Sequence, residues 1–223
     1  MFYSYVLNYL AIYILGTCMR PEQYWWDCFT RVISFVNAVF CINGIVRYIL
    51  PNPGSYLFLL AEGDDGFVNT LYCFAAYLFV DGLFNTPQYL KKLNTDSITS
   101  LLHHYVGGLG IYMIAANRNG LGLGAYFAAT EISTPLLNIS WFLHTNKIKG
   151  TFTNLIFGLF YIVFTISRIL TIPFLMYYLY TNNTIIGELS LGKYIMVYGG
   201  SLTLVLLNVT WFAMLTKKMV GSR

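Results

Sequence analysis

The chain has 223 residues, of which 57% are hydrophobic and only 10% are charged, with a net charge of +4. A soluble globular domain carries about a quarter charged residues, so this chain has too little polar surface to face water on all sides. Its basic residues are scattered singly or in pairs, without the stripe that nucleic-acid binding needs. The composition therefore indicates an integral membrane protein with no nucleic-acid partner.

The apolar segments predict an all-α transmembrane helical bundle, because a helix needs about 20 apolar residues to cross a bilayer. About seven spans are predicted by this rule, or six if the N-terminal segment does not cross. They cover residues 2–19, 29–50, 67–90, 98–116, 120–144, 152–180 and 192–215. No positive charge precedes the first apolar run, so it is interpreted as an uncleaved span rather than a signal peptide.

The loop charges predict the orientation of the bundle. With seven spans, nine basic residues fall on one side and three on the other, with Arg168 inside a span. The nine are Arg20, Arg31, Lys91, Lys92, Lys147, Lys149, Lys217, Lys218 and Arg223, and the three are Arg47, Arg118 and Lys193. Positive charge marks the cytosolic side, so the N-terminus is expected outside or in a lumen and the C-terminus in the cytosol. The acidic loop at residues 61–66 and Asn182, a glycosylation candidate, then fall on the outer side.

Five ionisable residues fall inside the predicted spans, where a charge costs at least about 2.5–3.5 kcal/mol. They are Asp81, His103, His104, Glu131 and Arg168. Arg168 cannot lose its proton, so it needs an acceptor, and Glu131 and Asp81 are the candidates. Pairing of one carboxylate with Arg168 leaves the other free to lie against a histidine. A purely structural ion pair that fixes helix register is the alternative.

The adjacent His103 and His104 are the most unusual feature of the sequence. On a helix they point about 100° apart, so both can border one cavity, but they are poorly placed to bind one metal ion, and no metal site is expected. Gly107, one turn after His103, would admit a lipid chain or a neighbouring helix. Thr99 and Ser100, four residues before the histidines, are expected to fix the ring tautomers. Ordinary interhelical hydrogen bonds are the alternative.

A second polar patch lies at residues 129–142. Glu131, Pro135 and Asn138 fall on one helical face, with Thr134 alongside. Pro135 leaves the carbonyl of Glu131 without its helical hydrogen bond and kinks the span. A broken helix around a carboxylate is tolerated only inside protein or beside a water-lined cavity, so this segment is predicted to form one wall of a site. A simple packing kink is the alternative.

These patches resemble the TLC-domain family, which includes ceramide synthases and the translocating-chain-associating membrane protein; the closest similarity is to its small members. The resemblance runs through RVISFVNAVF (31–40), AAYLFVDG (75–82), LLHHYVGG (101–108), AATEISTPLLNISWFL (128–143), VFTISRILTIPF (163–174) and LLNVTWFAMLTKK (206–218). It implies a TLC domain at residues 25–218, after an N-terminal transmembrane segment and loop at 1–24 and before a short cytosolic tail at 219–223.

The resemblance also implies an endoplasmic-reticulum membrane and roles for single residues. His103 and His104 match the histidine pair that takes part in acyl transfer in ceramide synthases. Arg168 matches an arginine of the family, and Glu131 matches the glutamate of the small members. Ceramide synthases carry paired acidic residues about a turn before the Glu131 position, whereas residues 125–130 contain no carboxylate here. This departure favours binding over catalysis.

Two functions are therefore predicted. In the first, an intramembrane cavity binds a sphingolipid or phospholipid without a cofactor, and the protein acts in membrane lipid homeostasis, sensing or trafficking, alone or as a homodimer. The candidate lipid-binding residues are Asp81, His103, His104, Gly107, Glu131, Thr134, Asn138 and Arg168.

In the second, the protein is an acyltransferase that moves an acyl chain from acyl-CoA, its co-substrate, to a sphingoid or other lipid acceptor. The candidate catalytic residues are His103, His104, Glu131 and Arg168. A carboxylate within hydrogen-bonding reach of a histidine would favour this function, since an orienting acid makes a better base. Imidazoles that touch only aliphatic side chains would exclude it.

Overall fold

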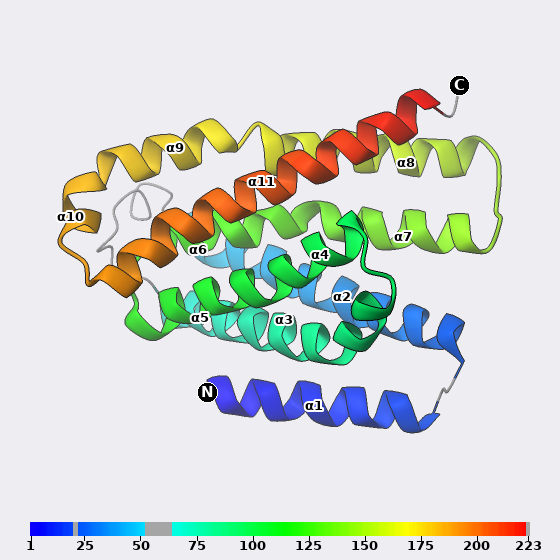
Figure 1. Ribbon diagram of the computed structural model, residues 1–223, viewed down its shortest axis with the longest axis horizontal. Coiled ribbons are helices and arrows are strands. Elements are labelled where there is room, and N and C mark those ends of the chain that lie inside the picture. The colour runs from blue at the N-terminus through cyan, green and yellow to red at the C-terminus, as the bar shows by residue number, and fades with distance from the viewer. Residues whose placement is uncertain (20–21, 52–63, 222–223) are drawn as a thin grey trace.

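The computed structural model describes residues 1–19, 22–51 and 64–221, and every regular element in these ranges is helical (Figure 1). The predicted all-α class is thus confirmed. The first long helices are α1 (Phe2–Met19), α2 (Gln23–Gly44), which continues into a π-helical turn (Ile45–Ile49), and α3 (Asp65–Lys91).

The next three helical stretches are each interrupted near the middle, and the last helix is continuous. The first contains α4 (Thr95–Leu102), a π-helical turn (His103–Gly107) and α5 (Gly108–Asn117). The second contains α6 (Leu121–Ala129), a 3₁₀ turn (Thr130–Ser133) and α7 (Thr134–Thr145). Then follow α8 (Thr151–Phe164), a π-helical turn (Thr165–Ile169), α9 (Ile172–Thr181), the short α10 (Asn183–Gly187) and the long α11 (Leu191–Gly221).

Among the described residues, five helical stretches are long and apolar enough to cross a membrane. They are Phe2–Met19, Gln23–Ile49, Asp65–Lys91, Thr151–Thr181 and Leu191–Val220. They agree with five of the predicted spans and support a multi-pass membrane protein. The other two predicted spans, 98–116 and 120–144, fall on α4–α5 and α6–α7. The total of seven membrane spans and the orientation of the two termini stay predictions.

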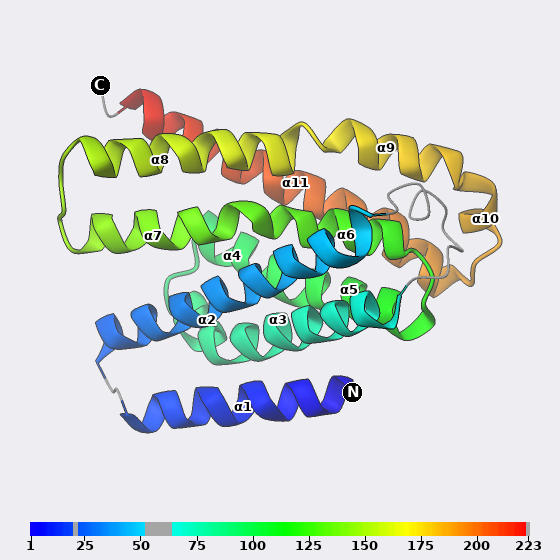
Figure 2. The same ribbon diagram turned by 180° about the vertical axis from the view of Figure 1, so that it is seen from behind.

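Helix α3 forms the centre of the bundle, because apolar side chains cover one of its faces at helical spacing. Phe67, Leu71, Phe74 and Leu78 are all fully buried, and they pack in one core with residues of α5, α6 and α11. Helix α1 lies at the edge of the bundle, beside α3, while α2 crosses α3 on the side seen in Figure 2. The core thus fixes α3, α5, α6 and α11 around one another.

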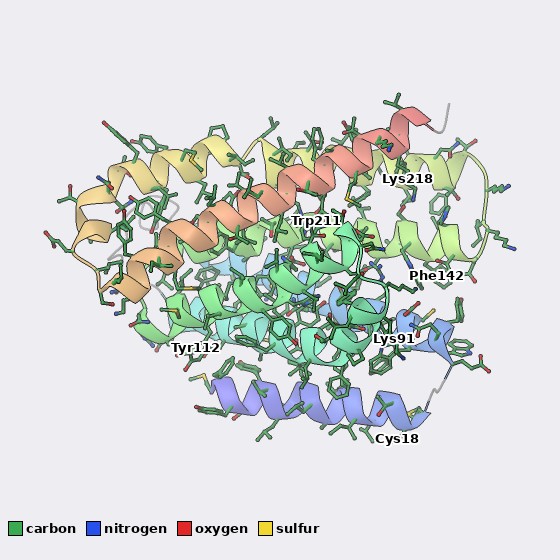
Figure 3. The ribbon with its side chains drawn as sticks, in the orientation of Figure 1. Cys18, Lys91, Tyr112, Phe142, Trp211 and Lys218 are labelled. Carbon is green, nitrogen blue, oxygen red and sulfur yellow. The ribbon has the colours of Figure 1, made fainter. Side chains whose placement is uncertain are left out.

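Basic residues collect at one end of the bundle. Lys91 at the end of α3 and Lys218 near the end of α11 lie at this end, whereas Tyr112 lies toward the other (Figure 3). This arrangement agrees with the one-sided charge distribution in the sequence. Arg20, Arg223 and half of the acidic loop, residues 61–63, lie outside the described residues.

The predicted glycosylation site does not fit this fold. Asn182 lies between α9 and α10, and its side chain is only 1% exposed. Its Nδ2 donates a hydrogen bond to the carbonyl oxygen of Tyr178 at 2.8 Å. A glycan would have to be attached to this buried nitrogen, so the folded structure speaks against Asn182 as an acceptor.

Candidate functional site

The interruptions of three helical stretches carry four of the five ionisable residues expected in the bundle interior, and the fifth, Asp81, lies within α3. The π-helical turn His103–Gly107 begins with the two histidines, the 3₁₀ turn Thr130–Ser133 contains Glu131, and the π-helical turn Thr165–Ile169 contains Arg168. π-Helical turns are rare and occur frequently at functional sites. The predicted break before Pro135 is therefore present, as a 3₁₀ turn that leads into α7.

Arg168 and Glu131 form the first polar cluster. Nη2 of Arg168 lies 3.7 Å from Oε1 of Glu131, and both side chains are buried. The guanidinium also donates from Nε to Oγ of Ser133 at 3.1 Å and from Nη1 to Oδ1 of Asn208 at 3.2 Å. Thr134 donates its hydroxyl to Oε2 of Glu131 at 2.8 Å. Glu131 is thus the carboxylate that compensates Arg168, and Thr134 belongs to the same cluster.

Trp211, near the middle of the bundle in Figure 3, connects this cluster to His103. The guanidinium carbon of Arg168 lies 5.6 Å from the Trp211 ring centroid, within the range of a cation–π contact. The His103 ring centroid lies 5.4 Å from the same ring, and Nε2 of His103 lies 3.9 Å from Oε1 of Glu131. His103 therefore stands at the edge of the Arg168 cluster.

His104 faces the other carboxylate. Its Nε2 lies 3.2 Å from Oδ2 of Asp81, and both residues are buried. Tyr13, from α1, donates its hydroxyl to Oδ1 of the same carboxylate. Gly82 allows this approach, because a Cβ atom at that position would come within 2.9 Å of Cβ of His104. A carboxylate is thus within reach of a histidine, which is the arrangement that favours the second predicted function.

The adjacency of the two histidines now has a geometric explanation. Their ring planes are 70° apart, with 5.5 Å between ring centroids, and each ring faces a different carboxylate. In the ranges that the structure describes, no three histidine, cysteine, aspartate or glutamate side chains are grouped to hold a metal ion. One pair of neighbouring residues therefore serves two polar clusters.

Several buried polar atoms of these clusters have no hydrogen-bond partner among the described residues. They are Nδ1 of His103, Nδ1 of His104, Oε1 of Glu131 and Nδ2 of Asn208. The expectation that Thr99 fixes the His103 ring is wrong, because its hydroxyl donates to the carbonyl oxygen of Thr95 at 2.8 Å. An unpartnered buried polar atom costs about 1–3 kcal/mol, so each of these atoms gains from a hydrogen bond with a bound molecule.

Asn138 is the predicted site residue that the structure places elsewhere. Its Oδ1 accepts a hydrogen bond from Nη1 of Arg31 at 3.2 Å, and its Nδ2 donates to Oγ of Ser34 at 3.2 Å. Both partners lie in α2, so Asn138 connects α7 to α2 instead of joining the Arg168 cluster.

A groove that is partly open to the outside runs between α5, α6 and α11, and the 620 Å³ of empty space in it includes the open space at its mouth. Its lining is mostly apolar and includes Met113, Leu123 and Met196. Gly107 is the predicted site residue that lines it. At one end lie Asn117, Asn119, Gly120 and Lys193.

The other end of the groove points toward the first polar cluster. Gly107, Phe127 and Leu204 line this inner end, one on each wall. His103 lies four residues before Gly107, whereas Glu131 and Asn208 lie four residues after Phe127 and Leu204. Four residues span about 6 Å of helix. Side chains on a helix lean toward its N-terminus, so Glu131 and Asn208 lean toward the groove and His103 leans away from it.

The sequence analysis missed several members of the site. They are Tyr13, Ser133, Asn208 and Trp211. Tyr13 is one of nineteen tyrosines, and nothing in its neighbourhood sets it apart. Asn208 did carry a signal, since an amide inside a predicted span needs a partner in neighbouring helices.

The fold and the site together define a multi-pass membrane protein with a polar cluster buried at the end of an apolar groove. The family model of the TLC domain matches residues 1–217 of the chain. The chain therefore belongs to the TLC-domain family, as its motifs predict, and the match takes in α1 with Tyr13. No solved structure matches the chain.

Proposed function

We propose that this protein binds one lipid molecule inside the membrane and acts in membrane lipid homeostasis, sensing or trafficking. The lipid chain lies in the groove between α5, α6 and α11, and the polar end lies against Glu131 and Asn208. The position of this polar cluster about one helical turn beyond the inner end of the groove, on all three walls, carries the proposal.

The length of the groove fits a lipid chain. On α11 it extends from Lys193 to Leu204, and eleven residues of helix span about 16 Å. The hydrocarbon core of a bilayer is about 30 Å thick, so one leaflet is about 15 Å deep. A lipid chain whose length equals the depth of one leaflet would thus reach from Lys193 to the inner end of the groove. Its polar end would supply partners for the buried atoms that have none.

Two glycines allow a matched test. Gly200 lines the groove and Gly158 in α8 does not, and an added Cβ meets nothing within 4 Å at either position. We expect purified wild-type protein and Gly158→Leu to retain a co-extracted lipid in a fixed ratio to protein, measured by mass spectrometry. Gly200→Leu fills the groove and is expected to lose this lipid. Equal retention by both variants, or no lipid on folded wild-type protein, would refute lipid binding in this groove.

The contact between His104 and Asp81 favours a second candidate, an acyl-CoA-dependent acyltransferase. With Nε2 facing Asp81, the unpartnered Nδ1 of His104 is the nitrogen that accepts a proton. This proton comes from a lipid hydroxyl or amine as its oxygen or nitrogen attacks the thioester carbon. The new ester or amide bond forms, the carbon–sulfur bond breaks, and the departing thiolate takes the proton from His104.

The acyltransferase is tested with labelled acyl-CoA and a panel of lipid acceptors, using protein in nanodiscs. We expect His104→Ala and Asp81→Asn to lower the rate by about 10²–10⁴-fold, the usual contribution of a general base. His144→Ala is the control, because His144 is exposed at the end of α7. No product from folded wild-type protein that retains its lipid would exclude this activity and leave the binding function.

The family also implies an endoplasmic-reticulum membrane, and we propose seven spans with a cytosolic C-terminus. The basic end of the bundle supports this orientation, because positive charge marks the cytosolic side. Lys147→Cys is expected to react with an impermeant maleimide from the cytosolic side, and Arg118→Cys from the opposite side. Labelling of both from one side would refute the orientation.

A further inference from the structure

The polar cluster at the inner end of the groove restricts the chemistry of the lipid head. We infer, resting on the proposed lipid binding, that the ligand is a single-chain lipid with an uncharged hydroxyl head, held between Oε1 of Glu131 and Nδ2 of Asn208.

The unpartnered atoms call for a group that both donates and accepts. Oε1 of Glu131 is an acceptor and Nδ2 of Asn208 is a donor, and both are buried without a hydrogen-bond partner among the described residues. Both side chains contact the same guanidinium, since Nη2 of Arg168 approaches Oε1 of Glu131 and Nη1 donates to Oδ1 of Asn208. One hydroxyl donates to the carboxylate and accepts from the amide, so it satisfies both atoms.

Charged heads are disfavoured at this position for opposite reasons. An ammonium group on Oε1 of Glu131 would lie next to the guanidinium of Arg168, which is 3.7 Å from the same oxygen. A carboxylate or phosphate on Nδ2 of Asn208 would share the guanidinium of Arg168 with the carboxylate of Glu131. Like charges repel strongly where water is excluded, and an unpaired buried charge carries a large desolvation cost. A neutral head avoids both costs.

The groove is narrow at its middle. A Cβ atom at Gly110, on the α5 wall, would lie 3.8 Å from Cε of Met196 on the α11 wall, which is ordinary van der Waals contact. The flexible side chain of Met196 therefore has to turn aside for a chain to pass between the two walls at this level. A second parallel chain would have to lie outside the groove.

The head group is tested by direct binding of three radiolabelled probes of equal chain length to purified protein in nanodiscs. The probes are a long-chain alcohol, the corresponding primary amine and the corresponding carboxylic acid. We expect the alcohol to bind at least about tenfold more tightly than either charged probe, which corresponds to about 1.4 kcal/mol. Gly200→Leu is expected to bind none of them, because it fills the groove.

The variant Asn208→Asp examines the head group without enlarging or emptying the site. It keeps an oxygen for Arg168 but replaces the amide donor by a second carboxylate oxygen. We expect it to bind the alcohol at least about tenfold more weakly and the amine more tightly than wild-type protein does. Asn154→Asp, an exposed change at the start of α8, is expected to bind all probes as wild type does.

The outcomes separate this inference from the function on which it rests. Tighter binding of the amine or the acid to wild-type protein, lost in Gly200→Leu, would overturn the hydroxyl head and retain the lipid-binding function. Unchanged alcohol binding in Asn208→Asp would also overturn it. Binding of no probe by folded wild-type protein that also retains no co-extracted lipid would refute both.

Discussion

Asp81 and Glu131 are both buried carboxylates that face a histidine, yet their surroundings differ. Glu131 is 4% exposed, and the permanent positive charge of Arg168 lies 3.7 Å away. Asp81 is 5% exposed, and it contacts the hydroxyl of Tyr13 and the imidazole of His104. A guanidinium keeps its charge at all ordinary pH values, whereas an imidazole gains or loses one proton.

This difference separates two tasks within one bundle. The Glu131 cluster joins the 3₁₀ turn, the π-helical turn of Arg168 and α11 through fixed charges, so it sets the register of these stretches. The Asp81 cluster joins α1, α3 and His104 through the contacts of one carboxylate with a hydroxyl and an imidazole. Charge compensation thus stabilises one side of the site, while the other side orients a histidine.

The largest expected effect comes from removing the fixed charge. Arg168→Met leaves Glu131 buried without a cation, which costs about 3–5 kcal/mol of the free energy of unfolding. Denaturant titration of purified protein measures this loss. The double variant Arg168→Met/Glu131→Gln is expected to recover most of it. A single variant as stable as wild type would show that Glu131 does not depend on Arg168.

A smaller loss is expected on the Asp81 side. Tyr13→Phe removes one buried hydrogen bond to a carboxylate, worth about 1.5–3 kcal/mol. Tyr9→Phe, one turn earlier on α1, is the matched control, because the Tyr9 hydroxyl makes a longer bond of 3.4 Å to Oδ1 of Asn37. We expect the control to cost about 0.6 kcal/mol in the same denaturant titration. Equal losses would contradict a special role for Tyr13.

Crowding of the His104 side chain is expected to lower the stability by a comparable or slightly smaller amount. Gly82→Ala places a Cβ atom 2.9 Å from Cβ of His104, and such overpacking costs about 1–3 kcal/mol. Thermal unfolding measures this cost, and the NMR signals of the His104 ring are expected to shift as the ring moves from Asp81. Gly158→Ala has open space and is expected to be stabilised by up to about 1 kcal/mol. Unchanged His104 signals would argue against the close approach.

The smallest effect is expected for an ion pair outside the core. Arg118 contacts Asp65, and their side chains are 58% and 76% exposed. Arg118→Gln is therefore expected to change the free energy of unfolding by only about 0–1 kcal/mol, less so in high salt. A loss as large as that of Arg168→Met would remove the distinction between buried and exposed charge pairs.

The sequence was sufficient to predict the helices and the residues that had to find partners. A buried arginine requires an acceptor whatever the fold, so the position of Arg168 inside a span was enough to indicate Glu131 or Asp81. The adjacent histidines and the proline-broken segment also predicted where the polar side chains would gather. These inferences depend only on the cost of polar groups in hydrocarbon.

Which polar side chains pair with one another could not be predicted from the sequence, because the pairing depends on how each helix is rotated about its axis. Asn138 shares a helical face with Glu131 in an ideal α-helix, yet it binds Arg31 and Ser34 of α2. The 3₁₀ turn between α6 and α7 changes the rotation between the two positions. The assignment of Glu131 to Arg168 and of Asp81 to His104 likewise required the packed bundle.

The π-helical turn at His103–Gly107 also affects how the chain accommodates an added or deleted residue. Its hydrogen bonds close over one residue more than those of an α-helix, so the turn behaves as a one-residue insertion. Deleting one residue there would restore α-helical geometry and leave α5 close to its present orientation, so Gly110 and Met113 would still line the groove. The wider turn thus lets the chain carry one more residue beside the two histidines without moving the walls of the groove.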